Sequence, residues 1–477
     1  MSICISGLGS RLISTKRITI EVSPEHPLIQ LMNTLDWQAL SKLVINDLKK
    51  TTSKLKWWLG RKLKVRVHLG IYLLQHLLNA RDRDIIRHIK DNAVYQVFCG
   101  EGFVKGFSIP AHAKISEFRS RLSPETQCEL ANSIAKMAVK EGFADPKHVD
   151  IDSTVQKPDM QHPASINLLV KTAIVGRRIQ KLLKSKFSKV LEDKIIDIDL
   201  KEIKGLAKEH YFEKRKDFKT KIPARKQALS KLWSKVSEIS QDIIRYGRML
   251  TEPYILESLN KRDRNLVISF IQKAPAFLTD IYEHCYDNVA RKSRIFSYYR
   301  DEVSCFNKNK HHKGLEFGRQ FQIGRVEGNF VFSVPNHSIR MPDAESFKRM
   351  LAGHIELFKT PIESISTDKG YYSKENEQLA LDFGIKEVGT QRPNRKLSNP
   401  PDNPISEEAQ EKLYNRRSGI EPIISHLKSG FQMGRSRAKT DRTTEASGFA
   451  SMLGFNLRQM VRYLTGEAML ESANECA

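Results

Sequence analysis

From residue 148 onward the chain contains short strand-like segments separated by helices, and the order of these segments limits the fold more than any other feature. The strand-like segments have alternating or apolar patterns, and the others have helical periodicity. The strand candidates are 148–152, 317–326, 329–334, 363–367 and 385–390. The helix candidates begin at Asp343, at Lys374 and at about Ser406. This order of elements is typical of a mixed α/β protein.

A long helical stretch interrupts the series after its first strand. Residues 165–300 have helical periodicity and are rich in Lys. Without this stretch, the order of elements is that of an RNase H-like nuclease core. We therefore predict a catalytic core at 146–160 and 312–430, with a basic helical insertion at 161–311.

The regions outside this core are assigned from the same patterns. We predict an N-terminal extension at 1–23 and an all-helical domain at 24–145, where apolar residues recur at helical spacing. That domain either binds DNA ends or serves packing and dimerisation, and periodicity does not choose between the two. Residues 431–477 are predicted to form a C-terminal basic loop and helix.

The net charge indicates the class of partner. Lys and Arg number 79 and Asp and Glu 55, which gives +24 at pH 7. An excess of this size indicates a polyanionic partner, most economically nucleic acid. Part of the excess is local, because 171–226 contains 18 Lys or Arg and 8 Asp or Glu. More of it follows the last predicted core helix, at Arg435, Arg437, Lys439 and Arg442.

Cysteine spacing and hydropathy exclude other classes. The six cysteines are scattered singly, so zinc-ribbon spacing is absent and a disulfide framework is disfavoured. No apolar run approaches the ~20 residues that span a bilayer. Both features predict an intracellular protein without a membrane segment.

Three carboxylates lie where phosphodiester chemistry would need them. Cleavage by two metal ions requires acidic side chains that converge from different elements, and Mg²⁺ prefers hard oxygen ligands. Asp152 ends the first strand, Asp368 follows a later one, and Glu421 lies on the closing helix. An aspartate at a strand end is by itself more often a turn former or helix cap. Asp150 points to the same face as Asp152, so alternation does not separate them.

Glu421 belongs to a regularly spaced set of polar residues. If its helix runs through, Tyr414, Arg417 and Lys428 lie within about 60° of one another and of Glu421 around the helix axis. A separate apolar stripe is suited to packing and consists of Ile420, Ile424, Leu427 and Phe431. One face of the helix can therefore pack on the core while the other presents polar groups to a phosphate backbone.

A capping box is the alternative interpretation of Glu421. Ser418 and Glu421 have the spacing of that motif, in which the Glu side chain bonds back to the start of a helix. Pro422 would then clash with the Ser418 carbonyl. We therefore predict a kink near 418–422.

The Tyr-(2)-Arg-(3)-Glu-(6)-Lys spacing at 414–428 resembles the signature of bacterial insertion-sequence transposases of the DDE type. The DSTVQ segment at Asp152 is similar to the first aspartate motif of that family, and the DKGY segment at Asp368 resembles the second. Further similar segments are 312–318, 449–464 and the helices that follow His26-Pro27-Leu28. The resemblance extends from about residue 24 to about residue 465.

The resemblance implies a role for each matching residue. The catalytic, metal-binding triad would be Asp152, Asp368 and Glu421. The residues that contact DNA near the cleaved phosphate would be Tyr414, Arg417 and Lys428. Two Mg²⁺ ions are implied, with Mn²⁺ as a possible substitute. Better-described members of the wider family carry their large insertion after the second aspartate, so no hairpin-handling role is carried over to 161–311.

The family also implies an activity and partners. These are binding of terminal inverted repeats, metal-dependent cleavage, strand transfer into target DNA, and a homodimer or higher oligomer on DNA in the prokaryotic cytoplasm. One alternative is an RNase H-like nuclease without strand transfer, and another is a basic DNA-binding protein with an inactive triad. For His311 and His312 a solvated or DNA-facing pair is predicted over a metal site, because adjacent residues on an extended chain point apart.

Overall fold

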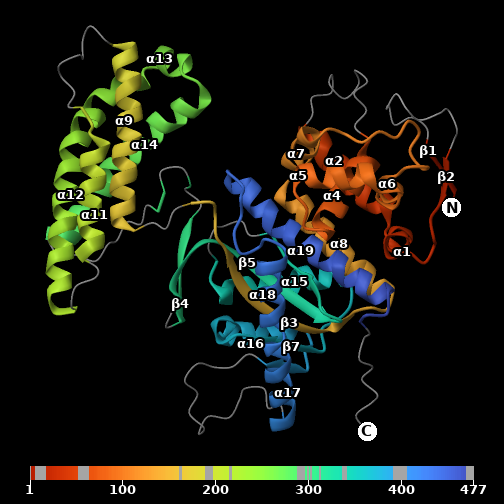
Figure 1. The fold of residues 1–477 in the computed structure, drawn as a ribbon. Coiled ribbons are helices and arrows are strands. Elements are labelled where there is room, and N and C mark those ends of the chain that lie inside the picture. Colours follow the sequence, from red (N-terminus) through yellow and green to blue (C-terminus); the bar gives the residue numbers. More distant parts are fainter. Residues whose placement is uncertain are drawn as a thin grey trace. The chain divides into compact units, whose positions relative to one another are not determined.

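The fold is described from a computed structural model, which forms two compact units (Figure 1). One unit comprises Met1–Asp159 and Cys305–Ala477, and the other is Met160–Ser304. The residues that the structure describes are 2–5, 18–51, 64–160, 164–187, 197–213, 218–286, 296–297, 300, 303–310, 313–335, 341–389 and 406–468.

A six-stranded mixed sheet forms the centre of the first unit. The strand order is β4-β5-β3-β7-β8, and β6 pairs with β5. The strands are β3 (Asp145–Gln156), β4 (Ser304–Lys310), β5 (Lys313–Glu327), β6 (Phe330–Phe332), β7 (Ser364–Thr367) and β8 (Glu387–Gly389). β3 is antiparallel to β5 and parallel to β7, and β7 is parallel to β8. The prediction of a mixed α/β protein is confirmed.

β4 is a strand that the sequence patterns did not predict. Its sequence, SCFNKNK, has few apolar side chains and two lysines. The strand lies at an edge of the sheet that the described residues form, and edge strands often carry lysine because its charge discourages pairing with another chain. The β5–β6 hairpin, in contrast, is formed by two predicted strands, 317–326 and 329–334.

Helices pack on this sheet and follow the predicted order. They are α15 (Asp343–Phe358), α16 (Lys374–Asp382), α17 (Glu407–Ser418) and α18 (Ile420–Gly430), with a short 3₁₀ turn, η2 (Lys369–Tyr371), after β7. α15 contacts β3 and β5, whereas α17 contacts β3, β7 and β8 and α18 contacts β3. The apolar residues of α15 at helical spacing are buried from Phe347 to Phe358, apart from the half-buried Ile355.

The N-terminal region is helical, as predicted. Its helices are α1 (Pro27–Thr34), α2 (Trp37–Thr51), α4 (Val65–Leu77), α5 (Asp82–Asp91), α6 (Ala93–Cys99), α7 (His112–Arg121) and α8 (Pro124–Lys140). A two-stranded ribbon, β1 (Ser2–Ile5) and β2 (Ile18–Glu21), precedes them. The Ser123 side chain caps α8 by accepting a hydrogen bond from the Thr126 N–H at 3.1 Å, as the sequence predicts.

The C-terminal helix α19 (Asp441–Leu464) joins these helices to the sheet. It lies along α8 (Figure 1), and it also contacts α4 and β6. Most of its residues from Thr444 to Met460 are buried. The N-terminal helices, the sheet and α19 consequently share one continuous hydrophobic core.

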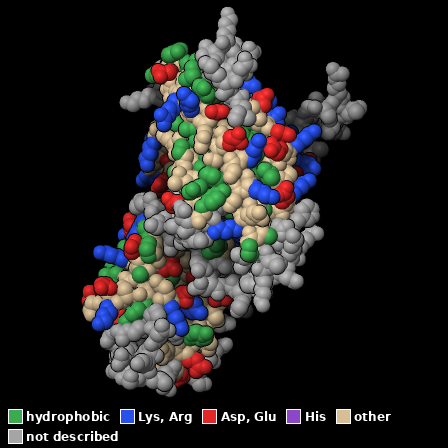
Figure 2. All heavy atoms as spheres, turned by 90° about the vertical axis from the view of Figure 1, so that its left-hand side faces the viewer, with side chains coloured by type: hydrophobic (Ala, Val, Ile, Leu, Met, Phe, Trp, Pro, Cys, Tyr) green, Lys and Arg blue, Asp and Glu red, His purple; other side chains and the backbone are tan. Residues whose placement is uncertain are grey.

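The second unit is helical and has a hydrophobic core of its own. Its elements are α9 (Ser165–Lys186), α11 (Leu200–Glu213), α12 (Phe218–Gly247), η1 (Arg248–Thr251), α13 (Pro253–Ser258) and α14 (Lys261–Tyr286). Arg177, Lys181 and Lys186 of α9 are exposed. In the view of Figure 2, Lys and Arg side chains alternate with Asp and Glu and do not gather into one patch. Within the described residues, no helix is both long and apolar enough to cross a bilayer.

Candidate active site

The register of β3 and β7 brings two of the predicted site residues side by side. The strands are parallel, and Ile151 of β3 pairs with Thr367 of β7. Asp152 and Asp368 come next on each strand, and the backbone at Asp368 is still extended. Neighbouring strands are ~5 Å apart and paired residues point to the same face. The two carboxylates therefore leave the same face of the sheet as neighbours.

Asp150 differs from Asp152 in its surroundings. Its carboxylate accepts hydrogen bonds from Ser366 Oγ at 2.5 Å and from Arg416 Nε at 2.8 Å. Arg325 Nη1 lies 3.5 Å away, and the Asp150 side chain is only 3% exposed. Asp150 is thus a buried, doubly paired charge, whereas Asp152 is half-buried at the next position on the same face. This distinction, which strand alternation could not make, favours Asp152 as a metal ligand.

Helices α17 and α18 cover the face that carries these aspartates. Arg416 of α17 reaches Asp150, and Asp152 points to the same side because it lies two residues farther along the strand. α18, which carries Glu421 in its first turn, contacts β3. All three predicted triad residues are therefore on elements that meet on one face of the sheet.

A cavity of about 380 Å³ joins three of the predicted residues. Its lining consists of Thr367, Asp368, Lys369, Gly389, Gln410, Tyr414 and Arg417. Arg417 Nη1 is 3.6 Å from Asp368 Oδ1, and the guanidinium carbon lies 5.6 Å from the centre of the Tyr414 ring. Asp368 is 56% exposed and Arg417 21%. An accessible carboxylate beside a guanidinium can hold a cation and a phosphate next to each other.

Glu421 and Lys428 lie on the neighbouring helix and do not line that cavity. α17 ends at Ser418, Gly419 separates the helices, and α18 begins at Ile420. Glu421 is exposed in the first turn, and Lys428 is half-buried two turns later. The apolar residues predicted to form a packing stripe are all buried, namely Ile420, Ile424, Leu427 and Phe431.

The break at Gly419 decides between the two interpretations of Ser418 and Glu421. The Ser418 hydroxyl donates to the Asn415 carbonyl at 2.6 Å, and α18 has no side-chain cap at its N-terminus. A capping box is therefore not formed, and the helix is interrupted at Gly419, within the range 418–422 where a kink was predicted. Because the helix does not run through, Tyr414 and Arg417 approach β7 from α17 while Glu421 belongs to a separate helix.

A buried tyrosine next to the aspartates was not singled out from the sequence. Burial raises the pKa of Tyr371 well above its usual range, and the charges of Asp343, Asp152 and Asp368 raise it further. The Tyr371 hydroxyl donates a hydrogen bond to Gln322 Oε1. Tyr371 is consequently a neutral donor within electrostatic range of both candidate metal ligands. The aromatic residue of the DKGY segment was the available signal.

Asp343 is a further carboxylate in this neighbourhood. It accepts hydrogen bonds from the Gln320 and Gln322 side-chain amides at 2.8 and 3.2 Å. A Cβ at Gly370 would lie 3.1 Å from its Oδ2, so the turn after Asp368 passes close to it. The sequence marks Asp343 only as a helix start, and no motif points to its proximity to the site.

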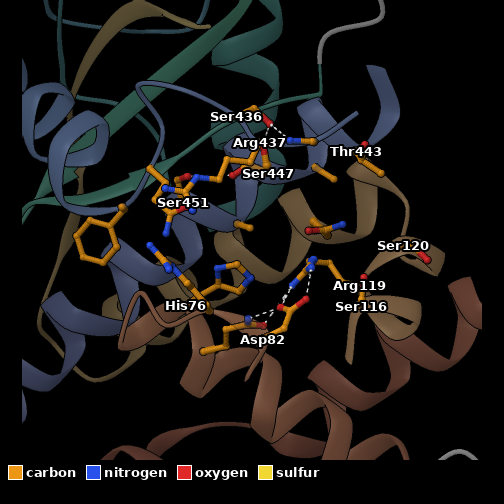
Figure 3. A pocket seen from close by; sticks show the side chains of 18 of the residues that line it. His76, Asp82, Ser116, Arg119, Ser120, Ser436, Arg437, Thr443, Ser447 and Ser451 are labelled. Atoms are coloured by element: carbon orange, nitrogen blue, oxygen red, sulfur yellow. Dashed lines mark hydrogen bonds and ion pairs between the residues drawn. The ribbon is translucent and has the colours of Figure 1, made fainter. Parts of the chain in front are cut away.

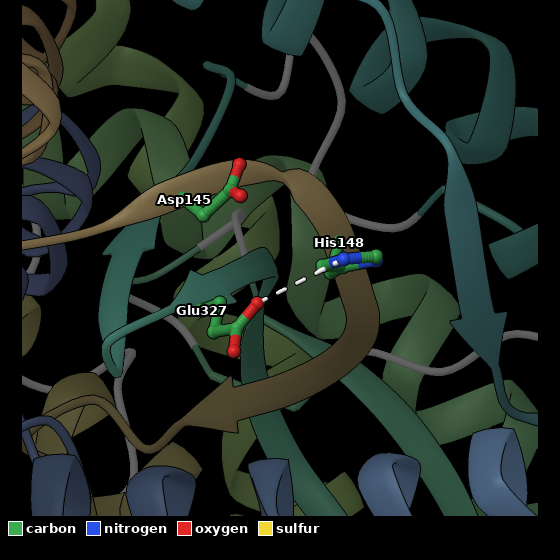
Figure 4. Close-up of side chains that lie close together, drawn as sticks. All are labelled: Asp145, His148 and Glu327. Carbon is green, nitrogen blue, oxygen red and sulfur yellow. Dashed lines mark ion pairs between the residues drawn. The ribbon is translucent and has the colours of Figure 1, made fainter. Parts of the chain in front are cut away.

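A second group of potential metal ligands lies at the other end of β3. Asp145, His148 and Glu327 have ligand atoms within 4.8 Å of one another (Figure 4). His148 Nε2 is 3.9 Å from Glu327 Oε2, and His148 Nδ1 is 2.8 Å from Ser364 Oγ. Asp145 precedes Asp152 by seven residues, or about 20 Å of extended strand. None of these three residues was predicted to be part of the site, and His311 and His312 lie outside the described residues.

Two comparisons with protein families cover much of the chain. Residues 17–121 match the family described as "Transposase domain", and residues 306–457 match the family described as "Transposase DDE domain". The second match contains Asp368, Glu421 and their polar neighbours, and the first contains helices α1 to α7. A DDE domain implies the use of a divalent metal ion.

One curated protein is also similar. It is an uncharacterized protein, ORF8 in the nfe locus of Rhizobium meliloti, which is 23% identical over 167 residues. The alignment covers 34% of this chain and 77% of that protein. No solved structure matches. On the two domain matches, this chain belongs to the insertion-sequence transposases of the DDE type.

Proposed function

We propose that this transposase binds the terminal inverted repeats of its own element, cuts there, and joins the freed 3′-hydroxyl to target DNA. Asp152, Asp368 and Glu421 are the proposed catalytic, metal-binding triad. The in-register placement of the two aspartates on adjacent parallel strands carries this proposal, because it supplies two converging ligands inside a chain with a transposase DDE domain.

We also infer that the core is RNase H-like. In support, β3, β5 and β6 form an antiparallel set that is followed by the parallel strands β7 and β8, with β3 in the middle of the sheet. The helices after the third, fourth and fifth of these strands occur in the order expected for such a core. The helical second unit, Met160–Ser304, interrupts the chain between β3 and the strands that follow, so the last residues of the proposed insertion at 161–311 form the edge strand β4.

The donor set fits a divalent cation with a preference for oxygen. The three candidate ligands are carboxylates, and Asp368 and Glu421 are exposed while Asp150 is already held by two arginines. We propose two Mg²⁺ ions, with Mn²⁺ as a substitute. When bound, such ions would supply Lewis-acid activation of the attacking oxygen and neutralise charge on the leaving oxygen.

The chain's own cations would position the DNA. Arg417 pairs with Asp368, and its planar guanidinium is suited to bind two phosphate oxygens at once. Tyr414 presents its ring beside Arg417, and Lys428 offers a point charge farther along α18. Tyr371 stays protonated and stabilises the backbone turn that carries Asp368. A dimer or higher oligomer on DNA is part of the proposal.

A strand-cleavage and strand-transfer assay tests this function. The probe is a duplex containing the inverted repeat that flanks the gene, mixed with a circular target in Mg²⁺. We expect nicked ends and end-joined target from the wild type, and neither product from Asp368→Asn. Nicks without joined target would indicate the nuclease alternative. Metal-independent binding without cleavage in any condition would indicate an inactive DNA-binding protein, and full activity of Asp368→Asn would exclude it as a ligand.

A further inference from the structure

A second and larger cavity lies within the first unit, and none of the six predicted site residues lines it. Its volume is about 540 Å³, and it is bounded by α4, α5 and α7 on one side and by α19 and the loop before it on the other. Figure 3 shows Arg437, Ser447 and Ser451 on one wall, with His76, Asp82 and Arg119 on the opposite wall. The cavity is thus formed jointly by the N-terminal helices and the C-terminal segment.

The two walls are held firmly together. A Cβ at Gly454 of α19 would lie 2.5 Å from the carbonyl oxygen of His76, so α4 and α19 approach each other as closely as glycine permits. The Asn79 side-chain amide donates to the Gly430 carbonyl at 2.7 Å. Because these contacts tie α4 to α19 and to the end of α18, the cavity has a fixed shape.

The lining is strongly cationic. It includes five Lys or Arg and one Asp, and these are Arg81, Arg119, Arg435, Arg437, Lys439 and Asp82. Asp82 is already neutralised by two hydrogen bonds from Arg119, at 2.7 and 3.0 Å. Arg435 pairs with Asp159 at 3.1 Å. Arg437 and Lys439 are exposed, and no ion pair joins either of them to a carboxylate among the described residues. The charges of Arg437 and Lys439 are therefore available to an anionic ligand.

The other lining groups suit a ligand that has both oxygen acceptors and an apolar part. Hydroxyl groups are contributed by Ser116, Ser120, Ser436, Thr440, Thr443, Ser447 and Ser451. Leu122, Ala446 and Ala450 supply apolar surface. The Nε2 atom of His76 is buried and has no hydrogen-bond partner among the described residues. Burial and the nearby Arg119 charge lower the pKa of His76 to about 3, so its ring is neutral at pH 7.

The cavity is connected to the candidate active site through β3. Lys157, five residues after Asp152, forms backbone hydrogen bonds with Gly434 and Ser436 of the loop that lines the cavity, at 3.3 and 2.8 Å. Ser447 donates to Gln156 Oε1 at 3.2 Å. Along an extended strand, five residues correspond to about 16 Å. A DNA strand that passes the carboxylates can therefore reach this cavity within a few nucleotides.

We propose that this cavity binds one nucleotide of a DNA strand, with its phosphate between Arg437 and Lys439 and its sugar or base against the apolar wall. The site fixes the position of the strand relative to the carboxylates that cut it. This proposal rests on the proposed function, because it assumes that DNA is the substrate. The same phosphate chemistry occurs in a free nucleotide, and the experiment separates the two.

The test measures DNA binding by the full chain without divalent metal, so that no strand is cut. The probe is the inverted-repeat duplex, carrying a neutral methylphosphonate at one position at a time. The cavity variant is R437A/K439A, and the charge-matched control is K136A/R462A, which removes two exposed cations that do not line the cavity. We expect roughly ten- to hundredfold weaker binding by the cavity variant and a log–log salt slope smaller by about 0.9 per lost phosphate contact.

The scan supplies the specific outcome. In the wild type and the control, one or two methylphosphonate positions should weaken binding, and in R437A/K439A the same positions should have no effect. Identical scans for the wild type and R437A/K439A would overturn the proposal. A second result would also overturn it. If millimolar deoxyadenosine monophosphate stabilises the wild type but not R437A/K439A, and the two scans are identical, the occupant is a free nucleotide and not a DNA strand. Cleavage of the unmodified duplex in Mg²⁺ reports separately on the proposed function.

Discussion

The two ends of β3 both carry acidic groups, and they differ in what surrounds those groups. At the amino end, Asp145, His148 and Glu327 have ligand atoms within 4.8 Å of one another, and the neighbouring Lys147 and Glu363 pair with each other at 3.0 Å. At the carboxyl end, Asp152 and Asp368 directly follow the paired residues Ile151 and Thr367, and Arg417 of α17 lies beside Asp368. Among the described residues, only the carboxyl end of β3 has beside it a helix, α17, that carries polar residues of the Tyr-Arg-Glu-Lys spacing.

Proximity of ligand atoms alone therefore does not identify an active site. The amino-end group is closer to an assembled metal site, and Asp145, His148 and Asp152 all precede the matched DDE domain, which begins at residue 306. The carboxyl end has its carboxylates on two adjacent strands and a helix. It also has Arg417, which contacts Asp368 and could contact a DNA phosphate in its place. We therefore assign the chemistry to the carboxyl end, and the predictions below test that assignment.

The largest expected effect is on the rate of strand cleavage, and it should differ between the two ends of β3. Asp152→Asn should lower the rate of strand cleavage by about a thousandfold or more, because a lost metal ligand removes several kcal/mol of charge stabilisation. Asp145→Asn is the matched control on the same strand and should change the rate by no more than about twofold. Initial rates on the inverted-repeat duplex measure both. A large loss in Asp145→Asn with little loss in Asp152→Asn would reverse the assignment.

The next effect concerns stability and separates the two neighbouring aspartates. Asp150→Ala should lower the free energy of unfolding by about 3 kcal/mol, because it leaves Arg416 and Arg325 without their buried partner. Asp152→Ala should lower it by no more than about 1 kcal/mol, since that side chain is only half-buried whereas Asp150 is 3% exposed. Urea unfolding measures the pair. Equal losses would show that Asp152 is also a structural residue.

The smallest effect is a pH dependence at the amino end. Burial lowers the pKa of His354 to about 4, and its Nε2 is 2.7 Å from the Pro146 carbonyl oxygen at the start of β3. An unfolded histidine titrates near 6.5, so between pH 6.5 and 4 the unfolded chain binds a proton that the folded chain does not. The contribution of neutral His354 to the free energy of unfolding is therefore fully present above about pH 6.5, and it is lost as the pH falls towards 4.

At pH 5, protonation of this histidine in the unfolded chain should lower the free energy of unfolding by about 2 kcal/mol relative to pH 7. His354→Gln has no titrating group at this position and should show a pH dependence weaker by that amount in urea titrations at the two pH values. His76, which has a similarly lowered pKa, contributes equally to both proteins. The same pH dependence in both would mean that His354 is protonated in the folded state.

Sequence patterns predicted the parts of this molecule that depend on local periodicity. The strand before Asp368, the helix that begins at Asp343 and the helix interruption before Glu421 follow from apolar spacing or from a proline clash. The first strand was predicted too short, because β3 continues four residues past Asp152, to Gln156. Patterns did not predict β4, because an edge strand rich in lysine has no apolar alternation. Nor did they separate Asp150 from Asp152, since that distinction depends on Arg416, which is 266 residues away in sequence.

The same limit applies to the sites. The polar residues of α17 and α18 could be found from their spacing, whereas Asp343 and Tyr371 approach the aspartates only through tertiary packing. The cationic cavity is another such case, because α4 and α7 supply one wall and a loop more than 300 residues later supplies the other. No spacing rule connects segments that far apart.

The assignment of the metal site is tested most directly by metal-directed cleavage of the protein chain. Fe²⁺ with ascorbate and peroxide, bound in place of Mg²⁺, generates hydroxyl radicals that cut the backbone close to the ion. The proposed site predicts cuts near residues 152, 368 and 421, which excess Mg²⁺ suppresses and Asp368→Asn abolishes. Cuts confined to the neighbourhood of residues 145–148 and 327 would place the metal at the opposite end of β3 and contradict the assignment.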